Sequence, residues 1–389
     1  MVLPQPLTTT AMATDGRAVA RDATGKVVFV EGALADETVA VEMTDDRSRW
    51  SSARVVDVLA ASPDRVAPPC PHRAAGCGGC PWQHVDPPAQ RRLKSSLVEE
   101  SLRRLADMEY VPLRPTVELE PWAWRTTIKA GVIDGRPALR KGRTHDLIPV
   151  PGCLIAHPLL LPLLDGPIHP GAESVVLRGG ARTGERLVAT TPSRLPTALS
   201  ADVQQRHYHE KAAGHLWRVS ARSFFQSRAD GADALADLVA DAAEGMGLTS
   251  PGRAVDAYSG VGLFAGVLAR HGWEVTAVEG SKAAVADARH NLGRLGVEVV
   301  GGDVTRWAAP RADLVVADPS RAGLGRTGVT SLTSTGASRI VLISCDVASM
   351  GRDTGLLTRA GYGLSAVTPV DLFPHSWRVE VVSVFDRRP

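Results

Sequence analysis

The chain has 389 residues, of which 44% are hydrophobic and 22% are charged, and its formal net charge is +2. This length exceeds one ordinary hydrophobic core, so we expect two or three domains, and the composition excludes a disordered chain. Because the net charge is small, any nucleic-acid-binding surface must be a local basic cluster. The sequence has neither an apolar run of about eighteen residues nor a signal-peptide pattern, which predicts a cytoplasmic protein.

Residues 1–62 contain short stretches rich in β-branched and apolar residues, separated by turn residues. These stretches are 17–21, 26–34, 37–44 and 53–60. Their length and spacing predict a small β-barrel, which we expect to have five strands. Prolines in the stretch 62–69 then interrupt regular structure.

A cysteine-rich loop, CPHRAAGCGGCPWQH, follows at 70–84. Three of the five cysteines of the chain, Cys70, Cys77 and Cys80, lie in this loop, and Cys153 follows after a long gap. In a reducing compartment, such cysteines indicate metal binding or catalysis more than disulfides. Four thiolates suit either zinc or an iron–sulfur cluster, so the spacing alone leaves both open.

The stretch 89–106 has apolar residues near one face and is predicted to be a helix. Charge patterning alone favours a solvated face for its basic residues, which are Arg91, Arg92, Lys94, Arg103 and Arg104. From about 116 to 220 the sequence is mostly β in character, with interruptions rich in Gly and Pro. The central part of the chain is therefore expected to be β-rich.

From about residue 229, helical and strand patterns alternate. Helices are expected at 232–246, 263–272 and 282–296. Strands are expected at 253–260, 274–280, 297–303, 312–320, 339–346 and 379–385. This alternation predicts a mainly parallel sheet with helices on both faces, which is an α/β, Rossmann-like fold.

The first strand of this α/β region ends in a turn that carries Gly260 and Gly262. Glycines let a ligand approach the backbone beside a helix start, although a tight turn without a ligand has the same pattern. Glu279 ends the next strand and could accept both ribose hydroxyls of a nucleoside, and Asp303 ends the third, where it could meet an adenine. One such acid is more often a cap or a surface charge, but the set indicates a nucleoside cofactor. Ala265 replaces the third glycine of a dinucleotide motif, which favours S-adenosylmethionine.

Cys345 stands where an apolar strand meets a loop at the same edge of the sheet. A lone cysteine is usually small, buried and inert. Here Asp318 and Arg321 end the preceding strand, and His375 and Glu380 lie just before the last one, so reactive groups share one edge. Such a centre suits thiolate addition to carbon 6 of uracil, which activates carbon 5 for methylation, followed by proton removal. Cys345 fits the nucleophile and Glu380 the base, while Arg321 could stabilise the thiolate or the enolate oxygen.

Along nearly its whole length, the chain resembles the RNA uridine-C5 methyltransferases, specifically the bacterial 23S ribosomal RNA branch with a TRAM domain and an iron–sulfur cluster. The resemblance lies in motifs that follow in family order: KVVFVEGAL, the cysteine loop, SARSFFQS, AYSGVGLF, VEG, ADPSRAG, ISCDVASMGRD and LFPHSWRVE. It implies a TRAM, OB-like barrel at 1–62, a central RNA-binding domain with the cluster at 63–220 and a class I methyltransferase domain at 221–389.

The resemblance also implies roles for particular residues. It puts the nucleophile at Cys345 and the base at Glu380. The cofactor-side residues that it implies are Gln226, Tyr258, Glu279, Asp303 and Asp318. The implied ligands of a [4Fe–4S] cluster, which would hold the shape of the central domain for RNA binding, are Cys70, Cys77, Cys80 and Cys153.

The chain departs from the family pattern in places, and other functions remain open at this point. Asp346-Val347 stands where family members commonly have Asn-Pro, Ser320 where they have Pro, and Leu263 where they have a polar residue. One alternative is a methyltransferase for small molecules or proteins, and another is an inactive RNA-binding homologue. Transfer RNA is the alternative substrate to 23S ribosomal RNA, and the sequence says nothing of oligomeric state.

Overall fold

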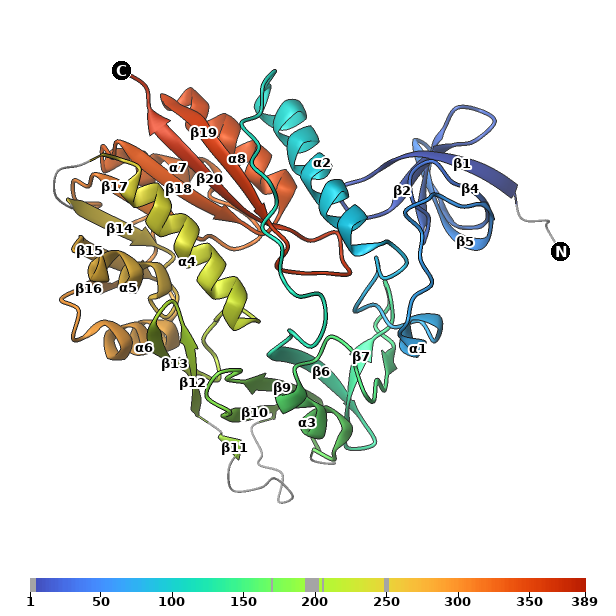
Figure 1. The fold of residues 1–389 in the computed structure, drawn as a ribbon, viewed down its shortest axis with the longest axis horizontal. Helices are drawn as coiled ribbons and strands as arrows, with labels where there is room; N and C mark the ends of the chain where they lie inside the picture. The colour runs from blue at the N-terminus through green and yellow to red at the C-terminus, as the bar shows by residue number, and fades with distance from the viewer. Residues whose placement is uncertain (1–4, 169–170, 193–202, 205, 248–251) are drawn as a thin grey trace.

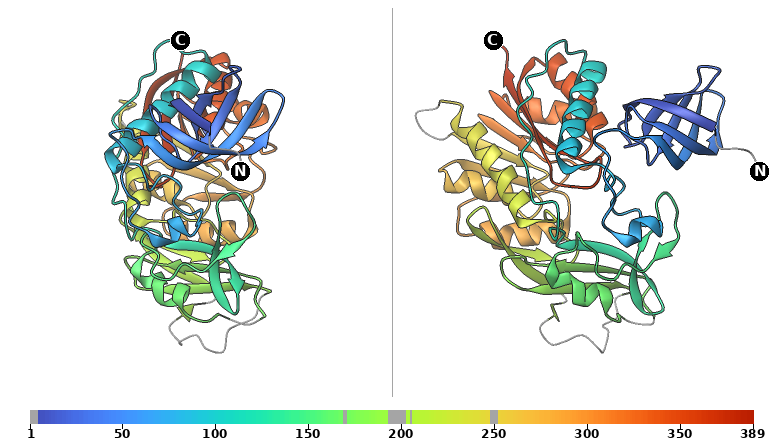
Figure 2. Two further views of the ribbon diagram at one scale, coloured as in Figure 1. Left: turned by 90° about the vertical axis from the view of Figure 1, so that its right-hand side faces the viewer. Right: turned by 45° about the vertical axis from the view of Figure 1, so that its right-hand side comes forward.

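A computed structural model describes residues 5–168, 171–192, 203–204, 206–247 and 252–389. Three bodies are visible in Figure 1: a β-barrel, a β-rich sheet in the middle of the chain and a helix-covered sheet that includes the C-terminus. The barrel projects to one side, as the right-hand view of Figure 2 shows. The expected fold class is therefore confirmed.

The barrel is closed by five strands, β1 (Gln5–Met12), β2 (Ala18–Arg21), β3 (Val27–Glu31), β4 (Thr38–Asp46) and β5 (Trp50–Ala60), in the order β1-β2-β3-β5-β4. Alternate residues such as Val28 and Val30 point into its core and are buried. The sequence analysis did not name β1, because its three consecutive threonines lack an alternating apolar pattern. Thr9 is nevertheless buried, and its hydroxyl donates to the Glu37 carbonyl at 3.1 Å.

The predicted helix is α2 (Pro87–Ala106), which lies between the barrel and the C-terminal sheet (Figure 1). It packs on α8 (Val347–Arg359), with Val98 and Leu102 in the shared apolar cluster. The expectation that its basic residues all form a solvated face is wrong for Lys94. That side chain is fully buried, and its ammonium donates to the Asp371 carboxylate and, at 2.9 Å, to the Phe373 carbonyl.

The central sheet has six strands in the order β11-β10-β9-β6-β7-β8. The strands are β6 (Thr127–Ile133), β7 (Arg136–Arg140), β8 (Leu147–Ile148), β9 (Ser174–Gly179), β10 (Arg186–Thr191) and β11 (Val203–Gln204). The short helix α3 (Leu161–Asp165) packs on this sheet, and Ile128 and Leu177 belong to the core between them. Helix α1 (Pro71–Ala74) lies in the cysteine loop near β7 (Figure 1).

A separate hairpin, β12 (His207–Ala212) and β13 (His215–Ser220), leads into the C-terminal region. Its Trp217 is fully buried in the same apolar cluster as residues of the C-terminal sheet. The division of the chain at residues 62 and 220 stays a prediction about independently folding units, since the packing of α2 and of this hairpin ties the regions together.

The C-terminal sheet has seven strands in the order β16-β15-β14-β17-β18-β20-β19. They are β14 (Arg253–Ala257), β15 (Glu274–Glu279), β16 (Glu298–Gly301), β17 (Leu314–Ala317), β18 (Arg339–Ser344), β19 (Tyr362–Val370) and β20 (Glu380–Arg387). The first five run parallel, and β20 pairs antiparallel with both neighbours. The carboxyl ends of the parallel strands therefore meet along one edge.

Helices cover both faces of this sheet, as the alternation predicts. They are α4 (Ala229–Glu244), α5 (Leu263–Arg270), α6 (Lys282–Leu292), α7 (Gly325–Ser334) and α8. Within β17, Leu314 and Val316 pack in one cluster with α4 and α5, while Val315 and Ala317 pack in another with α7 and α8. Among the described residues, no helix has both the length and the apolar content needed to cross a bilayer.

Candidate active site

A cavity of about 560 Å³ lies at the carboxyl ends of the parallel strands. It is lined by six of the seven residues predicted for catalysis and cofactor binding: Gln226, Tyr258, Glu279, Asp318, Cys345 and Glu380. These residues come from five strand ends and one loop that are far apart in the sequence. The arrangement agrees with the rule that ligands of open α/β sheets bind at this edge.

The glycine-rich turn after β14 forms one wall of this cavity. Gly262 precedes α5 with a φ of 100°, and a Cβ there would lie 2.6 Å from Leu292, so only glycine fits. Asp256 is fully buried at the end of β14 and accepts a 2.8 Å hydrogen bond from the Ala265 amide. This bond ties the start of α5 to the strand, which keeps the turn in place beside the cavity.

The carboxylate of Glu279 is held at the end of β15 by two backbone amides. Its Oε2 accepts from the Gly260 amide at 2.9 Å and its Oε1 from the Ser281 amide at 2.6 Å. Each oxygen keeps a further lone pair, so a cofactor diol can bind without breaking these contacts. Asp303 differs: it is exposed, accepts from the Thr305 amide and hydroxyl at 2.9 and 2.8 Å, and is not among the cavity-lining residues.

Strand register brings Cys345 and Glu380 together. Ser344 of β18 pairs with Val381 of β20 in antiparallel orientation. The next position on each strand is Cys345 and Glu380, so the two residues lie opposite each other at the cavity. The Glu380 side chain is 3% exposed, and Asp318 reaches the same space from the end of β17.

Burial disfavours the ionised forms of Asp318, Cys345 and Glu380. It raises the pKa of Glu380 well above its usual value, with the Asp318 carboxylate adding to the effect. Burial, followed by the charges of Glu380 and Asp318, raises the pKa of Cys345 to about 12, and Arg321 opposes this shift. The thiol is therefore protonated at neutral pH, and cationic groups in the cavity favour the reactive thiolate.

The helix that follows the cysteine starts with a side-chain cap. Asp346 precedes α8, and its carboxylate accepts from the Ser349 amide at 2.8 Å. Aspartate and asparagine serve equally well as helix N-caps, so the departure from the family pattern at this position preserves the start of the helix. Cys345 is thereby held at the junction of β18 and α8.

Phe224 and Arg378 also line the cavity, and the sequence analysis gave neither of them a role. Phe224 is 65% exposed beside the buried Phe225, so its ring is largely open to solvent at the cavity. Its loop is anchored by the buried Asp287, which accepts from the Ser223 hydroxyl at 2.6 Å. An aromatic pair in a loop was the available signal for Phe224, whereas Arg378 faces the cavity only because of the tertiary fold.

His375 does not lie in the cavity, although its sequence position had suggested a place in the reaction centre. Its ring lies 4.0 Å from that of Trp122, and its Nδ1 is 3.3 Å from Gln90 Nε2. Burial lowers the pKa of His375 to about 4, with Lys94 as the next cause. It is a neutral packing residue between α2 and the loop before β20.

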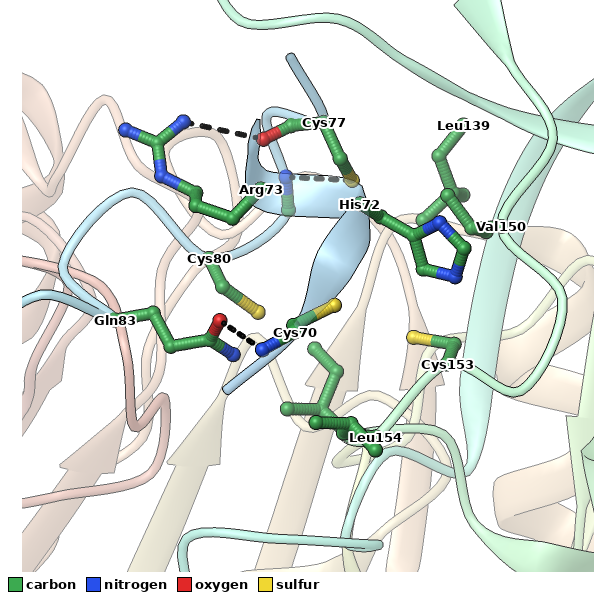
Figure 3. A pocket seen from close by; sticks show the side chains of 12 residues that line it. Cys70, His72, Arg73, Cys77, Cys80, Gln83, Leu139, Val150, Cys153 and Leu154 are labelled. Atoms are coloured by element: carbon green, nitrogen blue, oxygen red, sulfur yellow. Dashed lines mark hydrogen bonds between the residues drawn. The ribbon is translucent and has the colours of Figure 1, made fainter. Parts of the chain in front are cut away.

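A second pocket gathers the four predicted cluster cysteines, Cys70, Cys77, Cys80 and Cys153. Figure 3 shows their sulfur atoms directed toward a common space, with Leu139, Val150 and Leu154 around it. The Gly79 amide donates to the Cys77 sulfur at 3.4 Å. Burial raises the pKa of Cys77 and raises that of Cys80 to about 12.

The four thiols reach this pocket from two separate parts of the chain, the cysteine loop and the segment after β8. Across the described residues, no group of three or more His, Cys, Asp or Glu side chains has the arrangement of a metal-ion site. Four cysteine thiolates are a donor set that suits either zinc or an iron–sulfur cluster.

Comparison with protein-family models gives no match. Curated relatives do match along nearly the whole chain. A protein of Streptomyces avermitilis described as an uncharacterized RNA methyltransferase is 36% identical, with 95% of each chain covered. The 23S rRNA (uracil(1939)-C(5))-methyltransferase of Pectobacterium atrosepticum is 29% identical, covering 97% of this chain and 93% of its own.

Among solved structures, the tRNA (uracil-54, C5)-methyltransferase of Pyrococcus abyssi, in complex with S-adenosyl-L-homocysteine, is similar in fold. It superimposes with a TM-score of 0.75 and 19% identity, covering 98% of this chain and all of the other. The full-length relatives, the shared three-part fold and the cavity at the strand ends support one conclusion. The chain belongs to the RNA uracil-C5 methyltransferase family and is an S-adenosylmethionine-dependent RNA methyltransferase.

Proposed function

We propose that this enzyme forms 5-methyluridine in 23S ribosomal RNA, with Cys345 as nucleophile and Glu380 as base. The observation that carries the chemistry is the pairing of β18 with β20, which sets a thiol and a buried carboxyl group opposite each other in one cavity. The 23S enzyme of Pectobacterium atrosepticum, which aligns with 97% of this chain, supports the choice of substrate. The cytoplasm, where ribosomal RNA is accessible, is the compartment that we propose.

The proposed reaction begins when the Cys345 thiol gives its proton to water and the thiolate forms a bond to carbon 6 of the uracil. The electron pair of the carbon 5–carbon 6 double bond moves toward the carbonyl oxygen at carbon 4, which makes carbon 5 enolate-like. S-adenosylmethionine supplies the methyl group to carbon 5. Glu380 acts in its ionised form, which the raised pKa makes a stronger base, and takes the carbon 5 proton; the double bond then re-forms and Cys345 leaves as a thiolate.

The remaining cavity residues have supporting roles in this proposal. Arg321 and Arg378 bring positive charge to the edge where Cys345 must ionise. Gln226, Tyr258, Glu279 and Asp318 would hold the cofactor, with Glu279 accepting its ribose hydroxyls. Asp303 would reach an adenine only if its carboxylate turned away from Thr305.

For the cysteine pocket, we propose a [4Fe–4S] cluster bound by Cys70, Cys77, Cys80 and Cys153. Four cysteine thiolates are the usual ligands of such a cluster. The apolar surroundings of the thiols also suit a group that is shielded from water. Such a cluster would act as a structural crosslink.

The mechanism is tested by variants that fail at different steps. Glu380→Gln keeps the nucleophile, but carbon 5 deprotonation should slow by about 10²–10⁴, so methylated RNA should remain attached to Cys345. On a denaturing gel with labelled RNA, this variant should give a slow-migrating band. Cys345→Ala and the double variant should give none. Uridine methylation by Cys345→Ala at the normal rate would show that the thiol is only a core residue.

The substrate is tested separately by mapping 5-methyluridine in RNA from a strain that lacks the gene. Loss of one 5-methyluridine from 23S ribosomal RNA, restored by the wild-type gene and not by Cys345→Ala, is the expected result. Loss from transfer RNA with intact 23S ribosomal RNA would reassign the substrate. The catalytic proposal would be unaffected by that outcome.

A further inference from the structure

A groove of about 670 Å³ lies on the central sheet, outside both the active-site cavity and the cysteine pocket. Its walls come from β6, β7, β9, the segment after β7 and the cysteine loop at Gly78 and Gly79. Its basic lining residues are Arg125, Lys129, Arg140, Lys141, Arg143 and His145, and Glu173 is its one acidic lining residue among those described. We call this feature the basic groove.

Three of the described lysine and arginine side chains in the groove are exposed and unpaired. Lys129, Arg140 and Lys141 are exposed, and within the described part of the chain their side chains have no ion pair or hydrogen bond. Arg143, by contrast, is paired at 3.2 Å with Glu31 of the barrel. The three free cations are therefore available to an external anion.

Two of the cations lie on neighbouring strands of the sheet. Lys129 is on β6 and Arg140 is on β7, and each lies two residues from the terminal pair of these strands, Gly131 with Ala138. Both side chains line the groove, so an anion bound there can contact cations from two strands.

The loop that holds the cysteines forms one wall of the basic groove. The Gly78 amide donates to the Arg140 carbonyl at 3.1 Å, and the Gly142 amide donates to the Gly76 carbonyl at 3.0 Å. A Cβ on Gly78 would lie 2.9 Å from the Gly142 Cα, so this close approach requires glycine. The backbone that carries Arg140 and Lys141 is thus bonded to the loop that carries Cys77 and Cys80.

A backbone hydrogen bond joins the segment that lines the basic groove to the segment that lines the active-site cavity. Arg125 lines the groove, and the amide of the next residue, Thr126, donates to the Ser227 carbonyl at 2.8 Å. Ser227 follows Gln226, which lines the cavity. The groove and the cavity are therefore held by directly bonded segments.

We propose that the basic groove binds the phosphate backbone of the RNA segment next to the target uridine, with Lys129, Arg140 and Lys141 as phosphate contacts. This inference rests on RNA being the substrate, and it adds a binding surface to the proposed function. The groove contacts backbone and not bases, so it contributes affinity and orientation without sequence preference. The cysteine loop keeps the groove in shape by pairing with β7.

The test measures RNA affinity at several salt concentrations by fluorescence anisotropy, with a fluorescein-labelled oligouridylate of about 30 nucleotides. Each lost phosphate contact lowers the slope of log affinity against log salt by about 0.7 for a single strand. The triple variant Lys129→Ala/Arg140→Ala/Lys141→Ala should reduce the slope by about 2 and weaken binding at least about tenfold near 0.1 M salt. Thermal melting and the iron content should match the wild-type protein.

Arg136→Ala is the matched control. Arg136 is an exposed arginine on the same strand, but it does not line the groove and donates to the Asp165 carbonyl at 3.1 Å. The Arg136→Ala protein should show the same slope of log RNA affinity against log salt as the wild-type protein. An unchanged slope and affinity in the triple variant would overturn the inference. In methylation assays, the triple variant should raise KM for RNA and leave kcat unchanged, whereas an error in the proposed reaction would appear as inactive wild-type protein.

Discussion

Individual side chains in the active-site cavity are held by bonds that leave their reactive atoms free. Glu279 accepts from two backbone amides, which fixes its carboxylate while lone pairs still face the cavity. Cys345 and Glu380 lie close together because Ser344 of β18 pairs with Val381 of β20. A buried thiol beside a buried carboxyl group stays protonated until cations favour the thiolate, which limits reactions with anything except a bound substrate.

Glu279 should dominate cofactor affinity. Glu279→Ala removes the acceptor for two ribose hydroxyls, and a hydrogen bond to a charged group contributes about 1.5–3 kcal/mol. We expect S-adenosylmethionine affinity to fall at least about tenfold, measured by calorimetry. Glu279→Gln keeps one oxygen acceptor, so its S-adenosylmethionine affinity should fall less than that of Glu279→Ala. Equal affinities for wild type and Glu279→Ala would move the nucleoside site elsewhere.

Among the structural elements, the turn from β14 to α5 is held by Asp256, whose carboxyl group has a raised pKa. Burial raises the pKa of Asp256 to about 8, partly offset by the hydrogen bond from the Ala265 amide. The Asp256 Oδ1 atom has no hydrogen-bond partner in the described structure. The protonated acid therefore suits this place better than the carboxylate.

Asp256 should make the protein less stable as pH rises. The folded state keeps a proton that the unfolded state releases near pH 4, so the free energy of unfolding falls between about pH 4 and 8, by up to about 1.4 kcal/mol per unit. Asp256→Asn removes this dependence and should be more stable than wild type at pH 8.5, with a smaller difference at pH 5.5. Denaturant unfolding without cofactor measures both.

The variant Asp134→Asn is the control for this measurement. Asp134 is exposed and lies on the turn between β6 and β7, outside the C-terminal sheet that contains Asp256. It should follow the wild-type curve of unfolding free energy against pH. Parallel curves for Asp256→Asn and wild type across this range would mean that Asp256 is ionised in the folded protein.

At the level of the whole molecule, the barrel, the central sheet and the C-terminal sheet are joined through α2 and the cysteine loop. Lys94 of α2 forms a buried ion pair with Asp371 of the C-terminal region, and Trp82 of the cysteine loop donates to the Gly16 carbonyl of the barrel at 2.8 Å. Removing one partner of a buried ion pair costs about 3–5 kcal/mol, so this contact anchors α2. The Trp82 amide also donates to the His375 carbonyl at 2.8 Å, so the cysteine loop contacts both the barrel and the C-terminal region.

Loss of the cluster should therefore weaken RNA binding as well as remove colour. Protein purified without oxygen should be brown and contain iron and sulfide. Cys77→Ser should lose the colour, melt at a lower temperature and bind the labelled oligouridylate with a lower salt slope, because the wall beside Arg140 and Lys141 loosens. Stoichiometric zinc without iron in the wild-type protein would contradict the cluster assignment.

Much of this organisation follows from local sequence. Alternating apolar residues predict the strands of the barrel, continuous apolar runs predict those of the parallel sheet, and glycines at 260 and 262 mark a turn whose positive φ angles favour glycine. Cysteine spacing identifies four thiols as a set, and the acids at strand ends identify a ligand edge. These signals depend on neighbours in the chain, so they can be read without the fold.

Other features were decided only by contacts between distant segments. The antiparallel register of β18 and β20 brings Cys345 to Glu380, and packing of α2 on α8 buries Lys94 against a partner 277 residues away. The same contacts keep His375 out of the cavity. The cations of the basic groove are scattered between residues 125 and 145 and gather only when β6, β7 and the cysteine loop pair. Local patterns determine which way a side chain faces, but only long-range pairing determines what it faces.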